Sequence, residues 1–294
     1  HVLTGISLEI REGESVALVG ESGSGKSTLG RQLLGFETPS AGEVRFMGNP
    51  LGQLDANGIK EFRRNVQVVF QDSIGAVDPR FRIGRVIDEP LRHLTDLPEN
   101  VRRDRIADLL QMVSLHPHDA GKLPVQMSGG QLQRVCIARA LASNPKLIVL
   151  DEAVSNLDLT LQIQVLDLLT DLRKRLGVAY LFITHNFAVV DHLAHDVAVM
   201  YLGRIVERGS VDEVLRTPRH PYTQALLSAV PTLQPDGERP IIRLGGEAPS
   251  PANPPAGCHF HPRCPRADEG CTRDYPPATR LTETHVVHCF RHSH

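Results

Sequence analysis

The sequence predicts an α/β fold in which a parallel β-sheet alternates with helices and is followed by a proline-rich, cysteine-containing C-terminal extension. Strand-sized apolar runs separated by helical segments indicate the sheet, because strands covered on both faces read as continuous apolar runs. Hydrophobic residues make up 41% of the 294 residues, enough to build a core. Prolines and cysteines concentrate after residue 230, which predicts a separate extension.

The predicted elements fall into three segments. Strand-like runs alternate with turns up to about residue 70, residues 72–145 read mostly as helix, and strands alternate with helices again at residues 146–230. The expected strands are Val2–Ile10, Ser15–Val19, Gly42–Met47, Val66–Phe70, Lys146–Leu150, Tyr180–Thr184, Val197–Tyr201 and Ile205–Arg208. The expected helices include Ser27–Leu34, Val101–Leu115, Leu159–Leu176 and Pro221–Ala229. We therefore expect a domain at residues 1–230, with an inserted helical subdomain at about 72–145, and an extension at 231–294.

Charge and hydropathy exclude several classes of protein. The formal net charge of −2 does not favour binding to nucleic acid through a basic surface. No apolar run approaches the roughly 18 residues of a membrane-spanning helix. The start of the chain does not have the pattern of a secretory leader. We expect a soluble, cytosolic protein with no nucleic-acid partner.

A glycine-rich motif lies between the predicted strand Ser15–Val19 and the predicted helix Ser27–Leu34. It matches G-x-x-x-x-G-K-[ST], and this context disfavours an ordinary turn. Such a loop points backbone N–H groups at phosphate oxygens, helped by the helix dipole. Lys26 can reach the β- and γ-phosphates, and the Ser27 hydroxyl can bind Mg²⁺. The expected nucleotide-binding residues are Gly20, Glu21, Ser22, Gly23, Ser24, Gly25, Lys26, Ser27 and Thr28.

Two further motifs can face phosphates. Asp151 and Glu152 follow the apolar strand Lys146–Leu150. Asp151 can hold Mg²⁺ directly or through water, and the Glu152 carboxylate can polarise an attacking water. Residues 128–131 read Ser-Gly-Gly-Gln at the start of a helix. In isolation these four residues indicate a helix N-cap, although bare amides and a hydroxyl also suit a second phosphate site.

Together these motifs resemble the ATP-binding subunits of ABC transporters, which implies a P-loop NTPase fold of ABC type. The resemblance covers about residues 1–230, where the motifs follow the order of the family. Within the family, the chain is most similar to the ATPases of oligopeptide, dipeptide and nickel importers. Segments of the chain that carry the resemblance include Phe70–Pro79, Ser128–Asp158, Tyr201–Glu207 and Pro218–Leu227.

The resemblance assigns a role to each motif. Glu152 would be the general base, His185 would bond the γ-phosphate, and Gln71 would contact Mg²⁺ or the attacking water. Asp158 would couple two nucleotide sites across a subunit interface. The residues that would contact ATP held by a partner ATPase are Ser128, Gly129, Gly130 and Gln131.

The resemblance also implies an assembly. ATP would lie between this chain and a second, non-identical ATPase subunit. Two membrane permeases and an extracytoplasmic substrate-binding protein would complete a transporter. The chain would then be peripheral, on the cytoplasmic face of the inner membrane.

The chain departs from the family pattern at three places. Asn156 replaces the usual Ala of the Ser-Ala-Leu-Asp loop, and Met127 replaces the usual Leu before the signature. The aromatic residue that stacks on adenine should lie upstream of Val2, so either it precedes His1 in the native protein or adenine is held differently. Cys136, after the signature, is expected to be a buried small hydrophobe.

Four of the five cysteines occur near the C-terminus, at Cys258, Cys264, Cys271 and Cys289, with histidines around them. In a cytosolic chain such a group indicates metal binding rather than disulfides. The wide, uneven gaps favour a [4Fe–4S] cluster over Zn²⁺, and unliganded cysteines remain an alternative. Some peptide-importer ATPases with a similar tail carry such a cluster. No motif in this chain suggests electron transfer, so we expect a structural or redox-sensing role rather than a catalytic one.

Three functions are compatible with the motifs. The first is an ATPase that powers import of di- or oligopeptides, with nickel or a metal chelate as the alternative cargo. The second is a soluble, regulatory ABC-type ATPase, and the third is a metal-sensing module. An intact Glu152 and His185 disfavour a pure sensor, and a single ATPase half without heptads disfavours the soluble class. Copurification with permeases would separate the first function from the others.

Overall fold

The computed structural model describes residues 2–230, 242–246 and 249–292 of the chain. The chain forms two compact units. The first unit comprises His1–Glu9, Ser15–Leu29 and Ile183–His294, and the second comprises Ile10–Glu14 and Gly30–Phe182. The glycine-rich motif and the C-terminal extension therefore belong to the same unit. In the described part of the chain, none of the helices combines the length and apolar character needed to cross a bilayer.

The first unit is built on a mixed sheet. Its strands lie in the order β1 (Ser15–Val19), β7 (Asp196–Tyr201), β8 (Arg204–Ser210), β10 (Val286–Val287) and β9 (Thr279–Arg280). β1 and β7 are parallel, with Val16 opposite Asp196, and the remaining neighbours are antiparallel. Every residue of β1 is buried, as the apolar run predicts. The helices of this unit include α7 (Phe187–Leu193), α8 (Val211–Arg216), α9 (Pro221–Ser228) and α10 (Glu269–Arg273).

Within the first unit, the extension is held to the sheet through both backbone and side chains. β10 adds to the edge of β8, with Val286 opposite Arg208. The Nε2 atom of buried His285 lies 2.8 Å from the Glu207 carboxylate, which also accepts bonds from backbone N–H groups. Paired edges and satisfied buried polar groups hold this segment to the sheet although it contains few large apolar residues.

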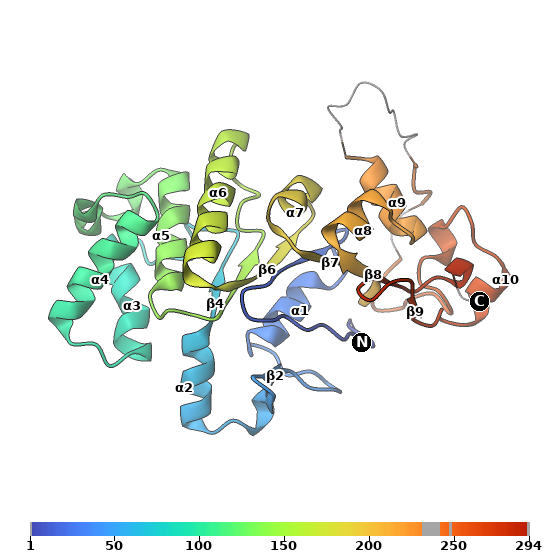
Figure 1. Cartoon of the computed structure of the whole chain (residues 1–294), viewed down its shortest axis with the longest axis horizontal. Coiled ribbons are helices and arrows are strands. Elements are labelled where there is room, and N and C mark those ends of the chain that lie inside the picture. The colour runs from blue at the N-terminus through green and yellow to red at the C-terminus, as the bar shows by residue number, and fades with distance from the viewer. Residues whose placement is uncertain (1, 231–241, 247–248, 293–294) are drawn as a thin grey trace. The chain divides into compact units, whose positions relative to one another are not determined.

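The second unit contains the parallel strands β4 (Val66–Val69) and β5 (Leu147–Asp151), with β6 (Ala179–Thr184) next in order. Figure 1 shows α3, α4 and α5 packed side by side, within residues 72–145, and the helical subdomain predicted there stays a prediction. A short hairpin of β2 (Arg45–Phe46) and β3 (Asn49–Pro50) precedes them. The helices are α2 (Ala56–Asn65), α3 (Ile83–Leu94), α4 (Glu99–Met112), α5 (Gly129–Leu141) and α6 (Leu159–Leu176).

Most predicted elements form within a few residues of the expected ends, but two strands differ. No strand forms among the described residues of Val2–Ile10, because Gly5 turns at a φ of +61° and interrupts the alternation. The predicted strand Gly42–Met47 shortens to β2. Met47 and Gly48 both have positive φ angles, which makes the tight turn of the hairpin.

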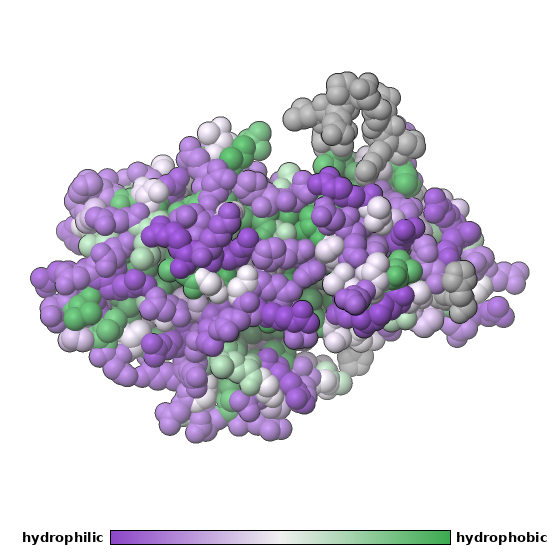
Figure 2. All heavy atoms as spheres, in the orientation of Figure 1, coloured by the Kyte–Doolittle hydropathy of each residue, from purple (hydrophilic) through white to green (hydrophobic). Residues whose placement is uncertain are grey.

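On the face seen in Figure 2, hydrophilic residues predominate and hydrophobic ones form small patches. Large hydrophobic side chains that are well exposed include Ile74, Val125 and Leu159, at 70%, 83% and 72%.

Residues 231–241 and 247–248 of the predicted proline-rich linker lie outside the described residues, and the boundary at residue 231 stays a prediction.

Candidate nucleotide-binding site

The glycine-rich motif forms a tight loop between β1 and α1 (Lys26–Leu33). Gly20 and Gly25 have φ angles of +156° and +103°. A Cβ atom on Gly20 would collide with the Met200 carbonyl oxygen and lie 2.9 Å from the Ser24 hydroxyl. On Gly25 a Cβ atom would lie 2.8 Å from the Leu3 side chain. Both positions therefore require glycine, for the backbone angle and for space.

Lys26 lies inside this loop and is only 6% exposed. Its Nζ atom donates to the carbonyl oxygens of Gly20 at 2.8 Å and Glu21 at 2.9 Å. The loop thus surrounds the ammonium group with its own oxygens and fixes a positive charge at the start of α1. A fixed positive charge, a glycine-rich backbone and a helix N-terminus together suit a phosphate chain.

His185 belongs to the same unit and directly follows β6, with its side chain exposed. The turn around it is fixed by its neighbours. The Asn186 N–H donates to the Thr184 hydroxyl at 3.1 Å, and the Asn186 side chain accepts from the Ala188 N–H at 2.9 Å, which caps α7. His185 therefore stands at the end of a strand, as the sequence predicts.

Asp151 and Glu152 lie at the end of β5 in the second unit, Asp151 inside the strand and Glu152 directly after it. Asp151 is the last residue of the strand, and Glu152 has a φ of +49°, which is unusual for a residue with a side chain. The Glu152 carbonyl oxygen accepts from the N–H and the hydroxyl of Ser155, at 3.1 and 2.8 Å. Such backbone strain costs about 1–3 kcal/mol and concentrates at functional positions, so it supports a role for Glu152 beyond ending a strand.

Gln71 lies beside the loop that follows Glu152. Its side-chain nitrogen is 3.5 Å from the Asn156 side-chain oxygen, and the Asn156 amide nitrogen is 3.4 Å from the Gln71 carbonyl oxygen. The structure thus brings together two residues that are 85 positions apart in sequence. Asn156, the departure from the family's usual Ala, is the residue that makes this contact.

The signature residues form the beginning of α5. The Ser128 hydroxyl caps the helix by accepting from the Gln131 N–H at 3.3 Å. The Ser128 N–H donates in turn to the Gln131 side-chain oxygen at 3.0 Å. Ser128 and Gly129 are exposed, while Gly130 packs against Leu161. The residues therefore make an ordinary capping box and also leave a helix N-terminus accessible.

Asp158 and Cys136 also occupy defined positions. Asp158 is exposed and caps α6 by accepting from the Leu161 N–H at 3.0 Å. Cys136 is buried in α5, as predicted, and burial raises the pKa of its thiol. The candidate residues thus fall into two groups. Gly20–Thr28 and His185 lie in the first unit, and Gln71, Ser128–Gln131, Asp151, Glu152 and Asp158 lie in the second.

Comparisons with known proteins identify the family. The family model described as "ABC transporter" matches residues 3–155, which include the phosphate loop, Gln71, the signature and Glu152. The chain belongs to the ABC transporter family. A second family model, "Oligopeptide/dipeptide transporter, C-terminal region", matches residues 206–271. This ABC ATPase therefore carries the predicted P-loop NTPase fold of ABC type.

Named relatives and solved structures agree with this assignment. The ABC ATPase is 46% identical to the dipeptide transport ATP-binding protein DppF of Escherichia coli, over 93% of this chain and 82% of the relative. It is 42% identical to the oligopeptide transport ATP-binding protein AppF of Bacillus subtilis, over 98% of this chain and 89% of the relative.

Among solved structures, CbiO1 from Clostridium perfringens, part of the ABC transporter complex CbiONQ, matches with a TM-score of 0.67 and 31% identity. That match covers 74% of this chain and 85% of the other. A dimeric post-hydrolysis ATP-binding cassette bound to ADP and Pi matches with a TM-score of 0.64 and 30% identity, over 71% and 90% of the two chains.

The four C-terminal cysteines of the ABC ATPase line one small cavity. Burial raises the pKa of each thiol, that of Cys258 to about 11. In the described residues, however, no three or more His, Cys, Asp or Glu side chains are placed to hold a metal ion. The predicted [4Fe–4S] cluster and its Zn²⁺ alternative therefore stay predictions.

Three histidines of the extension form hydrogen bonds away from the cysteines. The His259 ring lies 3.3 Å from the Leu202 carbonyl oxygen, the His288 ring 3.2 Å from that of Pro276, and the His285 ring 2.8 Å from Glu207. These contacts give the three histidines structural roles, whereas His261 lines the same cavity as the four cysteines.

Two residues that sequence reasoning missed contact the phosphate loop. The Glu21 N–H donates to the hydroxyl of buried Tyr222 at 2.8 Å, and the Glu21 carboxylate pairs with Arg263. Tyr222 and Arg263 lie 201 and 242 positions from Glu21. The position of Arg263 directly before Cys264 offered no signal of this contact.

Proposed function

We propose that this chain hydrolyses ATP to power the import of di- or oligopeptides through a membrane ABC transporter. The observation that carries the proposal is the match of residues 206–271 to the C-terminal region of oligopeptide/dipeptide transporters, beside a complete phosphate loop. The relatives described above are named for peptide transport, and they give no support to nickel import or to a soluble regulatory ATPase.

We assign the chemistry to two groups of residues. Lys26 and the loop amides bind the phosphates of ATP, and the Ser27 hydroxyl, the Asp151 carboxylate and the Gln71 amide oxygen are hard donors that suit Mg²⁺. Glu152 takes the proton from the attacking water as general base. His185 donates a hydrogen bond to the γ-phosphate.

A single chain does not supply every part of this site. Ser128, Gly129, Gly130 and Gln131 contact the γ-phosphate of ATP held by a second, non-identical ATPase subunit, and Asp158 couples the two sites. The exposed N-terminus of α5 supports this role, because it leaves amides available to an anion. The assembly includes two permeases and an extracytoplasmic binding protein, with this chain peripheral on the cytoplasmic face of the inner membrane.

Reconstitution tests the transport function. The complex of this chain with its partner ATPase and permeases is placed in vesicles, and ATP hydrolysis is measured with a substrate-binding protein loaded with a dipeptide, an oligopeptide or Ni²⁺. We expect the peptide-loaded protein to stimulate hydrolysis. Stimulation by the Ni²⁺-loaded protein alone would replace the peptide assignment with metal import.

The apolar residues of the loop after Gln71 predict a docking surface for a permease. The loop Ser73–Arg82 carries Ile74, Val77 and Phe81, which is unusually apolar for an exposed connection. Ile74 is exposed, but Val77 is 6% exposed and Phe81 is half-buried beneath the Arg85 guanidinium. This loop therefore presents a single large apolar side chain to solvent rather than three.

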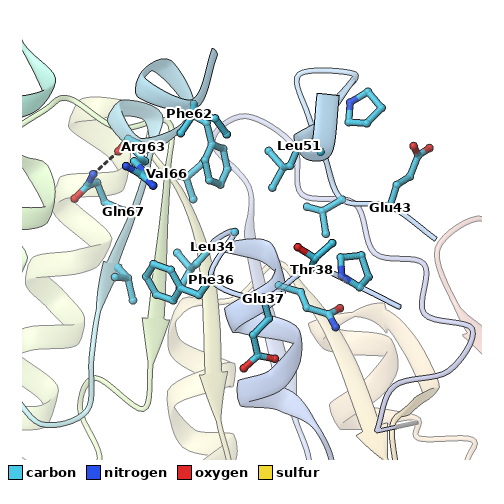
Figure 3. Close-up of a pocket in the computed structure, with 18 of the residues that line it drawn as sticks. Leu34, Phe36, Glu37, Thr38, Glu43, Leu51, Phe62, Arg63, Val66 and Gln67 are labelled. Atoms are coloured by element: carbon cyan, nitrogen blue, oxygen red, sulfur yellow. Dashed lines mark hydrogen bonds between the residues drawn. The ribbon is translucent and has the colours of Figure 1, made fainter. Parts of the chain in front are cut away.

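An apolar groove with a volume of about 870 Å³ lies elsewhere in the second unit. Figure 3 shows Leu34, Phe36, Leu51 and Phe62 around it. Phe36 is 62% exposed, and exposed aromatic residues commonly anchor protein interfaces. We assign this groove to a short helix of a membrane permease, because a transport ATPase must contact its permease and this groove offers an apolar floor.

Phe36→Asp should weaken assembly with the permeases by about tenfold or more, because it places a charge where an apolar anchor is required. ATP binding by the isolated chain should not change. Copurification with tagged permeases measures the effect, and Val125→Asp, at another exposed hydrophobic position, is the matched control. Equal recovery of the two variants would contradict the assignment of the groove.

We also propose that Cys258, Cys264, Cys271 and Cys289 bind a [4Fe–4S] cluster. Its support is that all four thiols border one cavity and that thiolates are the ligands such clusters use. When bound, the cluster would tie together four positions of a segment that has few large apolar residues. Its role is therefore structural or redox-sensing.

Iron analysis tests the cluster. Protein purified anaerobically should contain about four irons per chain and absorb visible light. Cys271→Ser should remove the iron, whereas Cys136→Ser, at the buried cysteine of α5, should retain it. Stoichiometric zinc without iron in the anaerobic preparation would decide in favour of the Zn²⁺ alternative.

A further inference from the structure

The Glu21 side chain of the phosphate loop forms a bidentate ion pair with Arg263 of the extension. Arg263 Nη1 lies 2.7 Å from Glu21 Oε2, and Nη2 lies 3.1 Å from Oε1. The Arg263 side chain is 7% exposed and that of Glu21 is 31% exposed. A fork-to-fork pair of this kind is geometrically specific, and its low exposure limits screening by salt.

The other polar groups of Glu21 also have fixed partners. Its N–H donates to the Tyr222 hydroxyl at 2.8 Å, and its carbonyl oxygen accepts from Lys26 Nζ at 2.9 Å. Amide, carbonyl and carboxylate are thus each held by a different residue. Glu21 is the point at which the lysine of the loop and the C-terminal extension meet.

Aromatic packing holds the partners of Glu21 in place. The rings of Tyr201, Tyr222 and Phe260 form a buried cluster with centroid distances of 4.7–5.4 Å. Phe260 is three residues before Arg263, and the Arg263 N–H donates to its carbonyl oxygen at 3.0 Å. The Arg263 Nη1 atom also lies 3.5 Å from the Tyr201 hydroxyl. Arg263 therefore has a supported position beside the loop rather than a mobile surface one.

Charge explains why the pair matters to a phosphate-binding loop. Glu21 places a carboxylate in the loop that is proposed to receive the negatively charged phosphates of ATP. Without a partner this carboxylate would oppose ATP, and with Arg263 it is neutralised. The hydrogen bond to Glu21 raises the pKa of the Arg263 guanidinium above its ordinary value, so the compensating charge is permanent.

We propose that Arg263 is a positioning residue for the phosphate loop: it neutralises and fixes Glu21 and thereby raises the affinity of the loop for MgATP. The inference rests on the proposed ATP-binding role of the loop. It gives the C-terminal extension a part in nucleotide binding through Glu21, in addition to any cluster that its cysteines hold.

The test is a titration of the full-length chain with MgATP. Arg263→Gln should raise the dissociation constant about fivefold or more, a change typical of coupling between sites. Adding Glu21→Gln to that variant should recover part of the affinity, because it removes the uncompensated charge. Arg263→Lys should lose less affinity than Arg263→Gln. The matched control is Arg273→Gln, at an exposed arginine of α10.

The outcomes separate this inference from the proposed function. If wild type binds MgATP and Lys26→Ala does not, the loop is the nucleotide site. In that case, equal affinity of Arg263→Gln and wild type overturns the positioning role alone. A double variant that binds no better than Arg263→Gln also overturns it, because a general loss of structure would not be relieved by Glu21→Gln. Absence of ATP binding by wild type overturns both.

Discussion

Glu152→Gln is expected to abolish ATP turnover at the site that holds this chain's phosphate loop while leaving ATP bound. The amide cannot accept the proton of the attacking water, and losing a positioned general base costs about 10²–10⁴-fold in rate. Glutamine has nearly the same shape, so the strained backbone at φ +49° and the contacts of Ser155 to the Glu152 carbonyl should persist.

Single-turnover hydrolysis in the assembled complex measures this effect. The site that holds the partner's phosphate loop is inactivated beforehand, so that any remaining hydrolysis belongs to this chain. Glu99→Gln, at an exposed glutamate of α4, is the control and should hydrolyse ATP like wild type. Hydrolysis that continues unchanged in the Glu152→Gln complex would refute the assignment of the base.

The phosphate loop could be predicted because its signal is local. Strand, glycine-rich turn and helix occur within one short stretch, and Gly20, Gly23 and Gly25 all have positive φ angles that favour glycine. The strands around Val19, Leu150 and Ile183 were predicted for a similar reason, since a buried strand must be apolar on both faces.

The remaining features depend on contacts between distant parts of the chain. Val2–Ile10 has the alternation of a strand, yet a single positive φ at Gly5 interrupts it. The Glu21–Arg263 pair joins residues 242 positions apart, and neither residue type is unusual where it stands. Sequence periodicity reports which face of an element is buried, but it does not report which distant side chain meets a given carboxylate.

The Gln71–Asn156 contact illustrates the same limit. Asn156 looked like a mild departure from a family pattern, and only the structure places its amide beside Gln71. By contrast, the N-cap at Ser128 was recognisable from the sequence, because a cap acts on amides two or three residues away.

Lys26→Ala should weaken MgATP binding by about tenfold to a hundredfold, because a charge-assisted hydrogen bond contributes roughly 1.5–3 kcal/mol. The structure adds a second reason for a large effect. Lys26 Nζ donates to the carbonyl oxygens of Gly20 and Glu21, so removing the lysine side chain also removes two hydrogen bonds within the loop. Isothermal titration of the isolated chain measures the affinity, with Lys60→Ala, at an exposed lysine of α2, as control. Equal affinities of wild type and Lys26→Ala would mean that the loop between β1 and α1 does not bind the phosphates.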